Sequence, residues 1–80
     1  MVRPNFENTL PSSIEAEKSV LGSALISREA AEHAIELLKG EDFHLPIHQD
    51  IFAMMVRLYN GGSAVDNVTV TDALRRARSQ

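Results

Sequence analysis

The sequence predicts an all-α fold, a small orthogonal helical bundle of about four to five helices. Apolar residues recur at spacings of three and four in four segments, which is the spacing of amphipathic helices. A serine, a threonine or a proline stands where each of these helices would begin. Only residues 65–70 (VDNVTV) alternate as a strand would, and weakly, so we interpret them as a loop that leads into the last helix.

Length and composition indicate one small domain without disulfides. The chain has 80 residues and no cysteine, so neither disulfides nor thiolate zinc sites can stabilise it. Its net charge of −3 argues against a general nucleic-acid binder. No apolar run reaches the ~18 residues that span a bilayer. Residues 1–10, interrupted by Pro4, lack the apolar core of a signal peptide, and we interpret them as a flexible arm. We therefore expect a soluble, cytoplasmic protein with no membrane contact, and a helical domain over residues 11–80.

The first helix is predicted within residues 10–26. Ser12 is the predicted N-cap, and Glu15 follows three residues later as its capping-box partner. One face of the helix is apolar and comprises Ile14, Val20, Leu21, Ala24 and Leu25. A neighbouring face is made of small residues that would let another helix approach closely, namely Ala16, Ser19, Gly22 and Ser23.

The second helix is predicted over residues 28–39, with Ser27 as its N-cap. Lys39 and Gly40 form its expected end, a cation at the negative end of the helix followed by a glycine in the left-handed conformation. Its predicted buried residues are Ala31, Ala34, Ile35 and Leu38. A short turn is expected at residues 41–43.

Two more helices follow. One begins at Pro46, whose missing N–H costs nothing in a first turn, and ends at Gly61 and Gly62. Its wide apolar face comprises Ile47, Ile51, Phe52, Met55, Leu58 and Tyr59, of which Phe52 and Leu58 are predicted to be essential to the core. Thr69 and Asp72 form a predicted capping box for the last helix, whose apolar residues are Val70, Ala73, Leu74 and Ala77.

The stretch from residue 41 to residue 55 (EDFHLPIHQDIFAMM) raises the question of a metal site. His44 and His48 are four residues apart, a spacing that places two zinc ligands on one turn of a continuous helix. Pro46 at the first helical position leaves His44 outside the helix, so the two imidazoles need not converge. The prediction is a helix entrance in which a partly buried His48 donates a hydrogen bond. The alternative is a small metal-dependent enzyme that uses His44, His48 and Asp50.

Glu17 is predicted to be buried, because it falls on the apolar side of the first helix between Val20 and Leu21. Its position near the helix start stabilises the negative charge. We expect it to accept a hydrogen bond from a buried donor, for which His48 is a candidate.

Catalytic motifs are not found. No glycine is followed by lysine, which excludes the phosphate-binding loop of ATPases, and the four glycines match neither a dinucleotide fingerprint nor a nucleophile elbow. We therefore expect no enzymatic activity of this chain, no catalytic residue, and no metal or cofactor.

Two sets of residues are candidates for a protein interface. The third helix is apolar almost all round, so it is either central in the bundle or presents a second face to another chain. That second face consists of Ala53, Met54 and Val56. The basic end of the last helix, formed by Arg75, Arg76 and Arg78, either stabilises the helix C-terminus or is a docking patch.

Three segments, SIEAEKSVLGSALI, LLKGEDFHLPIHQDIFAMMVRLYNGG and VDNVTVTDALRR, resemble in order and spacing the N-terminal domain of DnaB-type replicative DNA helicases. The resemblance runs from Leu10 to Arg76. It implies a non-catalytic helical domain that helps to build the N-terminal collar of a hexameric ring and contacts primase and, in some systems, helicase loaders. It also implies an ATP-dependent DNA helicase as the parent protein, whose ATP site lies in a separate C-terminal motor domain.

The chain departs from the family pattern in two ways. Ser63 and Ala64 stand where a charged residue and a proline are common, and Asn67 stands where an apolar residue is usual. The chain also stops at Gln80, before the helical hairpin through which these domains pair, so we expect a monomer or weak self-associator. Two related alternatives are the helicase-binding domain of primase and a free-standing helical adaptor of replication.

Overall fold

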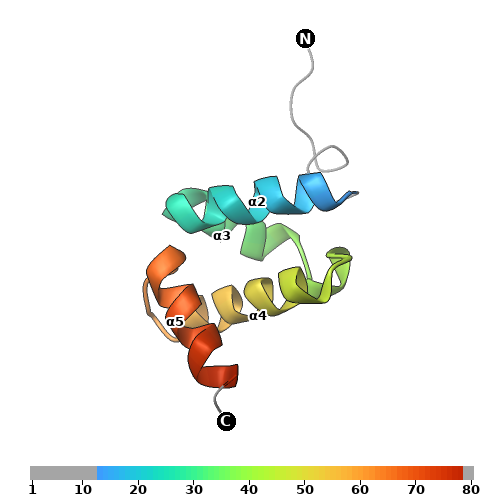
Figure 1. Cartoon of the computed structure of the whole chain (residues 1–80). Helices are drawn as coiled ribbons and strands as arrows, with labels where there is room; N and C mark the ends of the chain where they lie inside the picture. The colour runs from blue at the N-terminus through green and yellow to red at the C-terminus, as the bar shows by residue number, and fades with distance from the viewer. Residues whose placement is uncertain (1–12, 79–80) are drawn as a thin grey trace.

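A computed structural model describes residues 13–78 of the chain. These residues form α2 (Ile14–Ile26), α3 (Arg28–Leu37), the 3-10 turn η1 (Gly40–Asp42), α4 (Pro46–Asn60) and α5 (Asn67–Arg78). No strand occurs among them, and the predicted all-α fold class is confirmed (Figure 1). The predicted arm and Ser12 lie outside the described residues.

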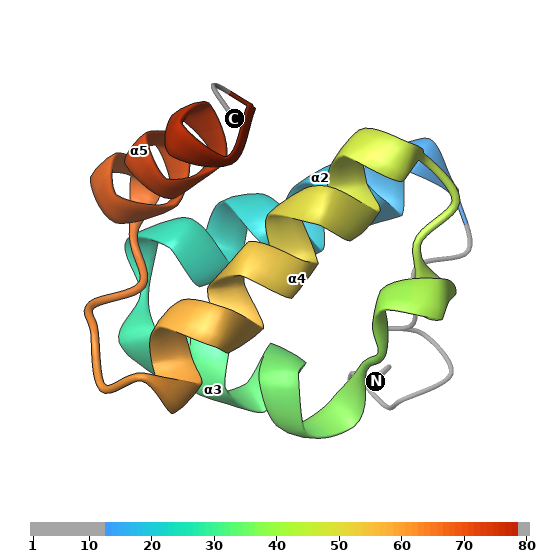
Figure 2. The same cartoon turned by 90° about the horizontal axis from the view of Figure 1, so that it is seen from below.

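Helix α4 is the central element of the bundle. The chain reverses at Ser27, so that α3 runs back beside α2, and α4 packs against both of them and against η1 (Figures 1 and 2). Helix α5 packs on α4. Of the two roles considered for the apolar third helix, the structure therefore shows the central one, and this position orders the core.

The core is made by residues from every helix and from two connecting segments. Its buried members are Leu21, Ala24, Ala31, Ala34, Leu38, Phe43, Phe52, Met55, Val65 and Val70. The rings of Phe43 and Phe52 lie with their centroids 5.0 Å apart, which fastens the segment after η1 to the middle of α4. Three residues of the predicted apolar faces are instead exposed. Ile14 and Ile47 have 38% and 39% of their surface exposed, and Ala77 is exposed at the end of α5.

The beginning of α2 differs from the prediction by one residue. Ser13 is the N-cap, and its hydroxyl accepts a hydrogen bond from the Ala16 N–H at 3.1 Å. A capping box needs a glutamate or glutamine three residues after the cap, and Ala16 occupies that position, one residue after Glu15. The Glu15 prediction was wrong because two adjacent serines offer equivalent caps. Gly22 was also misinterpreted, because it is exposed and nothing lies within 4 Å of a side chain added there.

Helix α3 begins as predicted, with the Ser27 hydroxyl accepting a hydrogen bond from the Ala30 N–H at 3.2 Å. It ends at Leu37, two residues early, because Leu38 adopts an extended conformation and buries its side chain. The Asp42 carboxylate then accepts a hydrogen bond from the Lys39 N–H at 2.7 Å and turns the chain into η1. Gly40 begins η1 and has no positive φ, so the predicted left-handed cap was wrong.

Helix α4 has the predicted bounds, and helix α5 begins earlier than predicted. Gly62, with φ 81°, is the one described residue in the left-handed conformation, and it terminates α4. Asp66 caps α5, because its carboxylate accepts a hydrogen bond from the Thr69 N–H at 2.9 Å and the Thr69 hydroxyl accepts one from the Asp66 N–H at 3.0 Å. Thr69 thus completes the capping box rather than beginning it, and Asp72 pairs with Arg76 instead.

Replacing Asp66 with alanine should destabilise the fold by about 0.5–2 kcal/mol, because it removes the cap of α5. Replacing Asp72 should cost less, because its exposed ion pair with Arg76 contributes about 0–1 kcal/mol. Urea denaturation followed by circular dichroism measures both. A larger loss for Asp72→Ala than for Asp66→Ala would contradict the observed capping box.

Replacing Phe52 with alanine should lower the free energy of unfolding by about 3–5 kcal/mol, because the ring is 3% exposed and packs on Phe43. Leu58 is half-buried, so Leu58→Ala should cost less, about 2 kcal/mol. Losses of this size are a large fraction of the stability of so small a domain. Val68→Ala, at a position 76% exposed, is the control and should change stability by less than about 0.5 kcal/mol. An equal melting temperature for Phe52→Ala and Val68→Ala would refute the core assignment.

Candidate functional site

Glu17 is the most unusual residue of the core, because a carboxylate is seldom buried without a charged or hydrogen-bonded partner. It lies in the first turns of α2, and none of its surface is exposed. The sequence places it there because it shares a face of the helix with Leu21 and Ala24, which are also buried. The predicted burial of Glu17 is therefore observed, and its partners determine what this group does.

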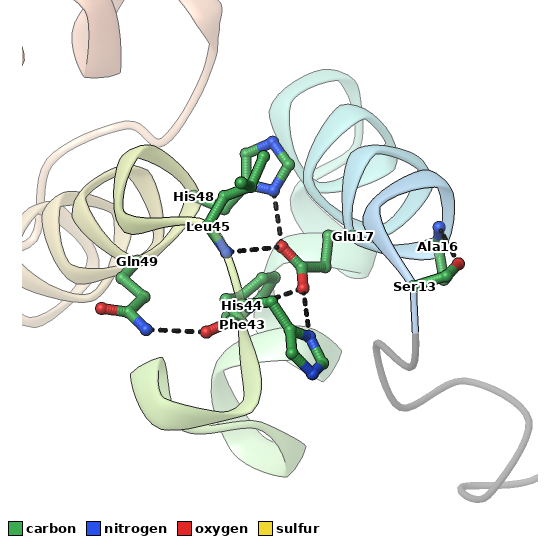
Figure 3. Close-up of polar contacts among 8 residues, drawn as sticks. All are labelled: Ser13, Ala16, Glu17, Phe43, His44, Leu45, His48 and Gln49. Carbon is green, nitrogen blue, oxygen red and sulfur yellow. Dashed lines mark hydrogen bonds and ion pairs between the residues drawn. The ribbon is translucent and has the colours of Figure 1, made fainter.

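The Glu17 carboxylate ties α2 to the segment that begins α4 (Figure 3). Oε2 accepts hydrogen bonds from the His44 N–H at 2.6 Å and from His44 Nδ1 at 2.7 Å. Oε1 accepts one from His48 Nδ1 at 2.7 Å and a longer one from the Leu45 N–H at 3.4 Å. The predicted contact between Glu17 and His48 is present, and His44 is an additional partner that the sequence did not indicate.

The hydrogen bonds hold the carboxylate in its charged form. Burial by itself raises the pKa of Glu17, but the hydrogen bonds from His48, His44 and Leu45 outweigh it and lower the pKa from 4.5 to about 2. Charge-assisted bonds of this kind are stronger than bonds between neutral groups. The Gln49 amide adds a further contact by donating to the Phe43 carbonyl at 2.7 Å across the same junction.

The two histidines converge on one carboxylate, although the sequence did not require them to do so. Pro46 does place His44 outside α4, but the chain turns so that both Nδ1 atoms reach Glu17. The rings lie on opposite sides of the carboxylate (Figure 3). Within residues 13–78 no three His, Cys, Asp or Glu side chains are arranged to hold a metal ion, and Asp50 is exposed. Both Nδ1 atoms are bonded to the Glu17 carboxylate, so this geometry fits a structural clamp formed by Glu17, His44, Leu45 and His48.

The structure brings some of the candidate interface residues together and separates others. Met54 and Arg76, from different helices, line one groove between α4 and α5. Ala53 is exposed, whereas Val56 is half-buried against the core. Arg76 pairs with Asp72 at 3.1 Å within that groove.

The other two arginines lie at a second groove. Arg75 and Arg78 are exposed and line it together with Ile47 and Leu74, from the beginning of α4 and the middle of α5. The apolar periodicity of α4 could not show that Ile47 is partly exposed at a groove, because the groove is formed with residues of α5. Met54 and Arg76 thus lie at one groove and Arg75 and Arg78 at another, whereas Ala53 and Val56 line neither.

Comparison with protein families decides the relationship of the chain. Residues 9–80 match the model of the family described as DnaB-like helicase N terminal domain. The chain belongs to this family.

The relatives of this DnaB-like domain are bacterial proteins named Replicative DNA helicase DnaB. The chain is 37% identical over 70 residues to that of Leifsonia xyli subsp. xyli, which covers 88% of this chain and 15% of the relative. It is 46% identical over 66 residues to the protein of Rhodothermus marinus, and the match covers 82% of this chain and 7% of the relative. It is 46% identical over 68 residues to the protein of Geobacillus stearothermophilus, and the match covers 85% of this chain and 15% of the relative. No solved structure gave a significant match.

The chain therefore spans 7–15% of the length of these three relatives. The DnaB-like match confirms the resemblance predicted from the sequence. Among residues 13–78, none of the helices is long and apolar enough to traverse a bilayer.

The lowered pKa of Glu17 predicts a specific acid response of the DnaB-like domain. Between pH 4.5 and 2 the unfolded chain takes up a proton on Glu17 and the folded chain does not. The stabilisation is therefore complete above pH 4.5 and is lost as the pH falls towards 2. The difference in free energy of unfolding between the wild type and Glu17→Gln should narrow across this range, as measured by urea denaturation at each pH.

Glu15→Gln is the matched control, because it removes an exposed carboxyl from the same turn of α2. This variant should retain the acid response of the wild type. A constant difference between the wild type and Glu17→Gln from pH 4.5 to pH 2 would show that the clamp does not hold the carboxylate charged.

Proposed function

We propose that this domain is a non-catalytic interaction and oligomerisation module of a replicative DNA helicase. In this role it contacts neighbouring helicase subunits, primase or a helicase loader, and the motor of the parent ATP-dependent helicase lies elsewhere. The proposal places the protein in the cytoplasm of a bacterium or of a phage-infected bacterium. Its support is the DnaB-like family match together with the names of the bacterial relatives.

The observation that carries the proposal is the groove between α4 and α5. Met54 contributes a half-buried apolar side chain, and Arg76 and Arg57 contribute cationic ones. An apolar centre with charged groups at its rim is the usual composition of a protein interface. The internal hydrogen bonds of Glu17 are compatible with this role, because they are made within the domain by residues that do not line the groove.

The family match favours the helicase over the primase side. The segment IEAE at the start of α2 and the segment EDF at η1 were the features that separated these alternatives in the sequence. In the structure Glu17 of the first segment accepts hydrogen bonds from the N–H groups of His44 and Leu45, the two residues that directly follow the second segment. The first segment therefore takes part in an internal contact, and we expect the partner surface elsewhere.

A chimera tests the proposal. This chain would replace the segment that it matches in the Geobacillus stearothermophilus helicase. We expect the chimera to form the same oligomer as its parent in analytical ultracentrifugation and to bind that organism's primase in a calorimetric titration. Met54→Glu and Arg76→Glu should each raise the dissociation constant of either the oligomer or the primase complex about tenfold, on the order of 1.4 kcal/mol.

Lys18→Glu is the control for charge reversal, because Lys18 is exposed on α2 and does not line the groove. Circular dichroism checks that each variant keeps its helices. A folded chimera that neither assembles nor binds primase would refute the proposed function. Normal assembly and primase binding by both groove variants would refute the groove as the contact surface.

A further inference from the structure

A third groove, lined mostly by apolar and small residues, lies between α2 and α3 and shares no residue with the two grooves at α5. Its floor consists of small side chains from both helices, Ala16, Ser19 and Ser23 on α2 and Ala30 and Ala34 on α3. Leu37 stands at its rim with 47% of its surface exposed. No Asp, Glu, Lys or Arg lines it. Small residues at a helix pair leave room for a third segment, so the composition fits an apolar occupant.

The open end of this groove is where the chain enters α2. The chain reverses at Ser27, so the beginning of α2 and the end of α3 lie together, and Ala16 and Leu37 line the same groove. Residues 1–12 precede the cap at Ser13. Twelve residues can extend about 40 Å, whereas the seven residues of α2 between Ala16 and Ser23 rise about 10 Å. The preceding segment is therefore long enough to turn back and follow the groove.

The sequence of that segment suits the groove. It has four large apolar side chains, of which Val2, Phe6 and Leu10 are spaced four residues apart and Met1 is the first residue. A spacing of four puts side chains on one side of the chain in a helix and also in an extended segment. Only Arg3 and Glu7 are charged. One face of the segment is thus apolar, as the groove requires.

We propose that the groove between α2 and α3 is a docking site for this chain's own residues 1–12, with Phe6 and Leu10 seated against Leu37 and the small-residue floor. Covalent attachment beside the groove gives the segment a high effective concentration, in the millimolar range for a short tether. The loop to be closed is short, so its entropic cost is small. These two terms favour the attached segment over a second copy of the chain. The inference is independent of the proposed helicase role.

A spin-label experiment on the full chain tests this docking. The chain has no cysteine, so Asn5→Cys offers a single site for a nitroxide next to Phe6. We expect relaxation enhancement at the amides of Ser19, Ser23 and Leu37 that exceeds the enhancement at exposed amides of α5. Adding Phe6→Ser and Leu10→Ser should abolish this excess while circular dichroism stays unchanged.

A matched pair of substitutions checks the groove itself. Ser19→Phe places a ring in the groove and should remove the enhancement, whereas Lys18→Phe, at the neighbouring exposed position outside the groove, should leave it intact. Enhancement that persists in the Phe6→Ser, Leu10→Ser variant, or that is equal over α5, overturns the proposal. So does enhancement transferred from spin-labelled to isotope-labelled chains in a mixed sample, because a second copy would then be the occupant.

Discussion

The bundle depends on one buried carboxylate. Glu17 lies in α2 and is fully buried. Its carboxylate accepts four hydrogen bonds, from His44 and Leu45, which directly precede α4, and from His48 in the first turn of α4. An unpaired charge at this position would be strongly destabilising, so the fold requires that the segment from His44 to His48 be held close to α2. The clamp thereby sets where α4, the central helix, begins.

The position of α4 then determines the rest of the core. With its first turn held at α2, its middle turns present Phe52 to Phe43 and place Met55 at the centre, where it has no exposed surface. Its far end is set by Gly62 and by the Asp66–Thr69 box, which orient α5 across it. Polar contacts at the two ends fix the geometry, and the apolar residues between them supply most of the stabilisation.

The sequence could predict what is local. Apolar spacing located all four helices, Pro46 and Gly61 marked both ends of α4, and Ser27 was recognised as a cap. Where the sequence offers two capping residues close together, as at Ser12 and Ser13 or at Asp66 and Thr69, the local pattern does not decide between them, and the structure shows Ser13 and Asp66 as the caps. Glu17 was predicted to be buried from its helical face, but His44 was missed because its contact spans 27 residues and depends on a turn outside any helix.

The clamp also explains why recognition by this domain should fall on grooves and not on its ionisable cluster. Both oxygens of Glu17 and both Nδ1 atoms are engaged with one another, and the two rings lie on opposite sides of the carboxylate, so the cluster offers no common point to a ligand (Figure 3). The two larger grooves, between α2 and α3 and between α4 and α5, share no residue. Each has its own pair of helices. The two proposals therefore concern separate surfaces, and a segment docked in one groove would leave the other open to a partner.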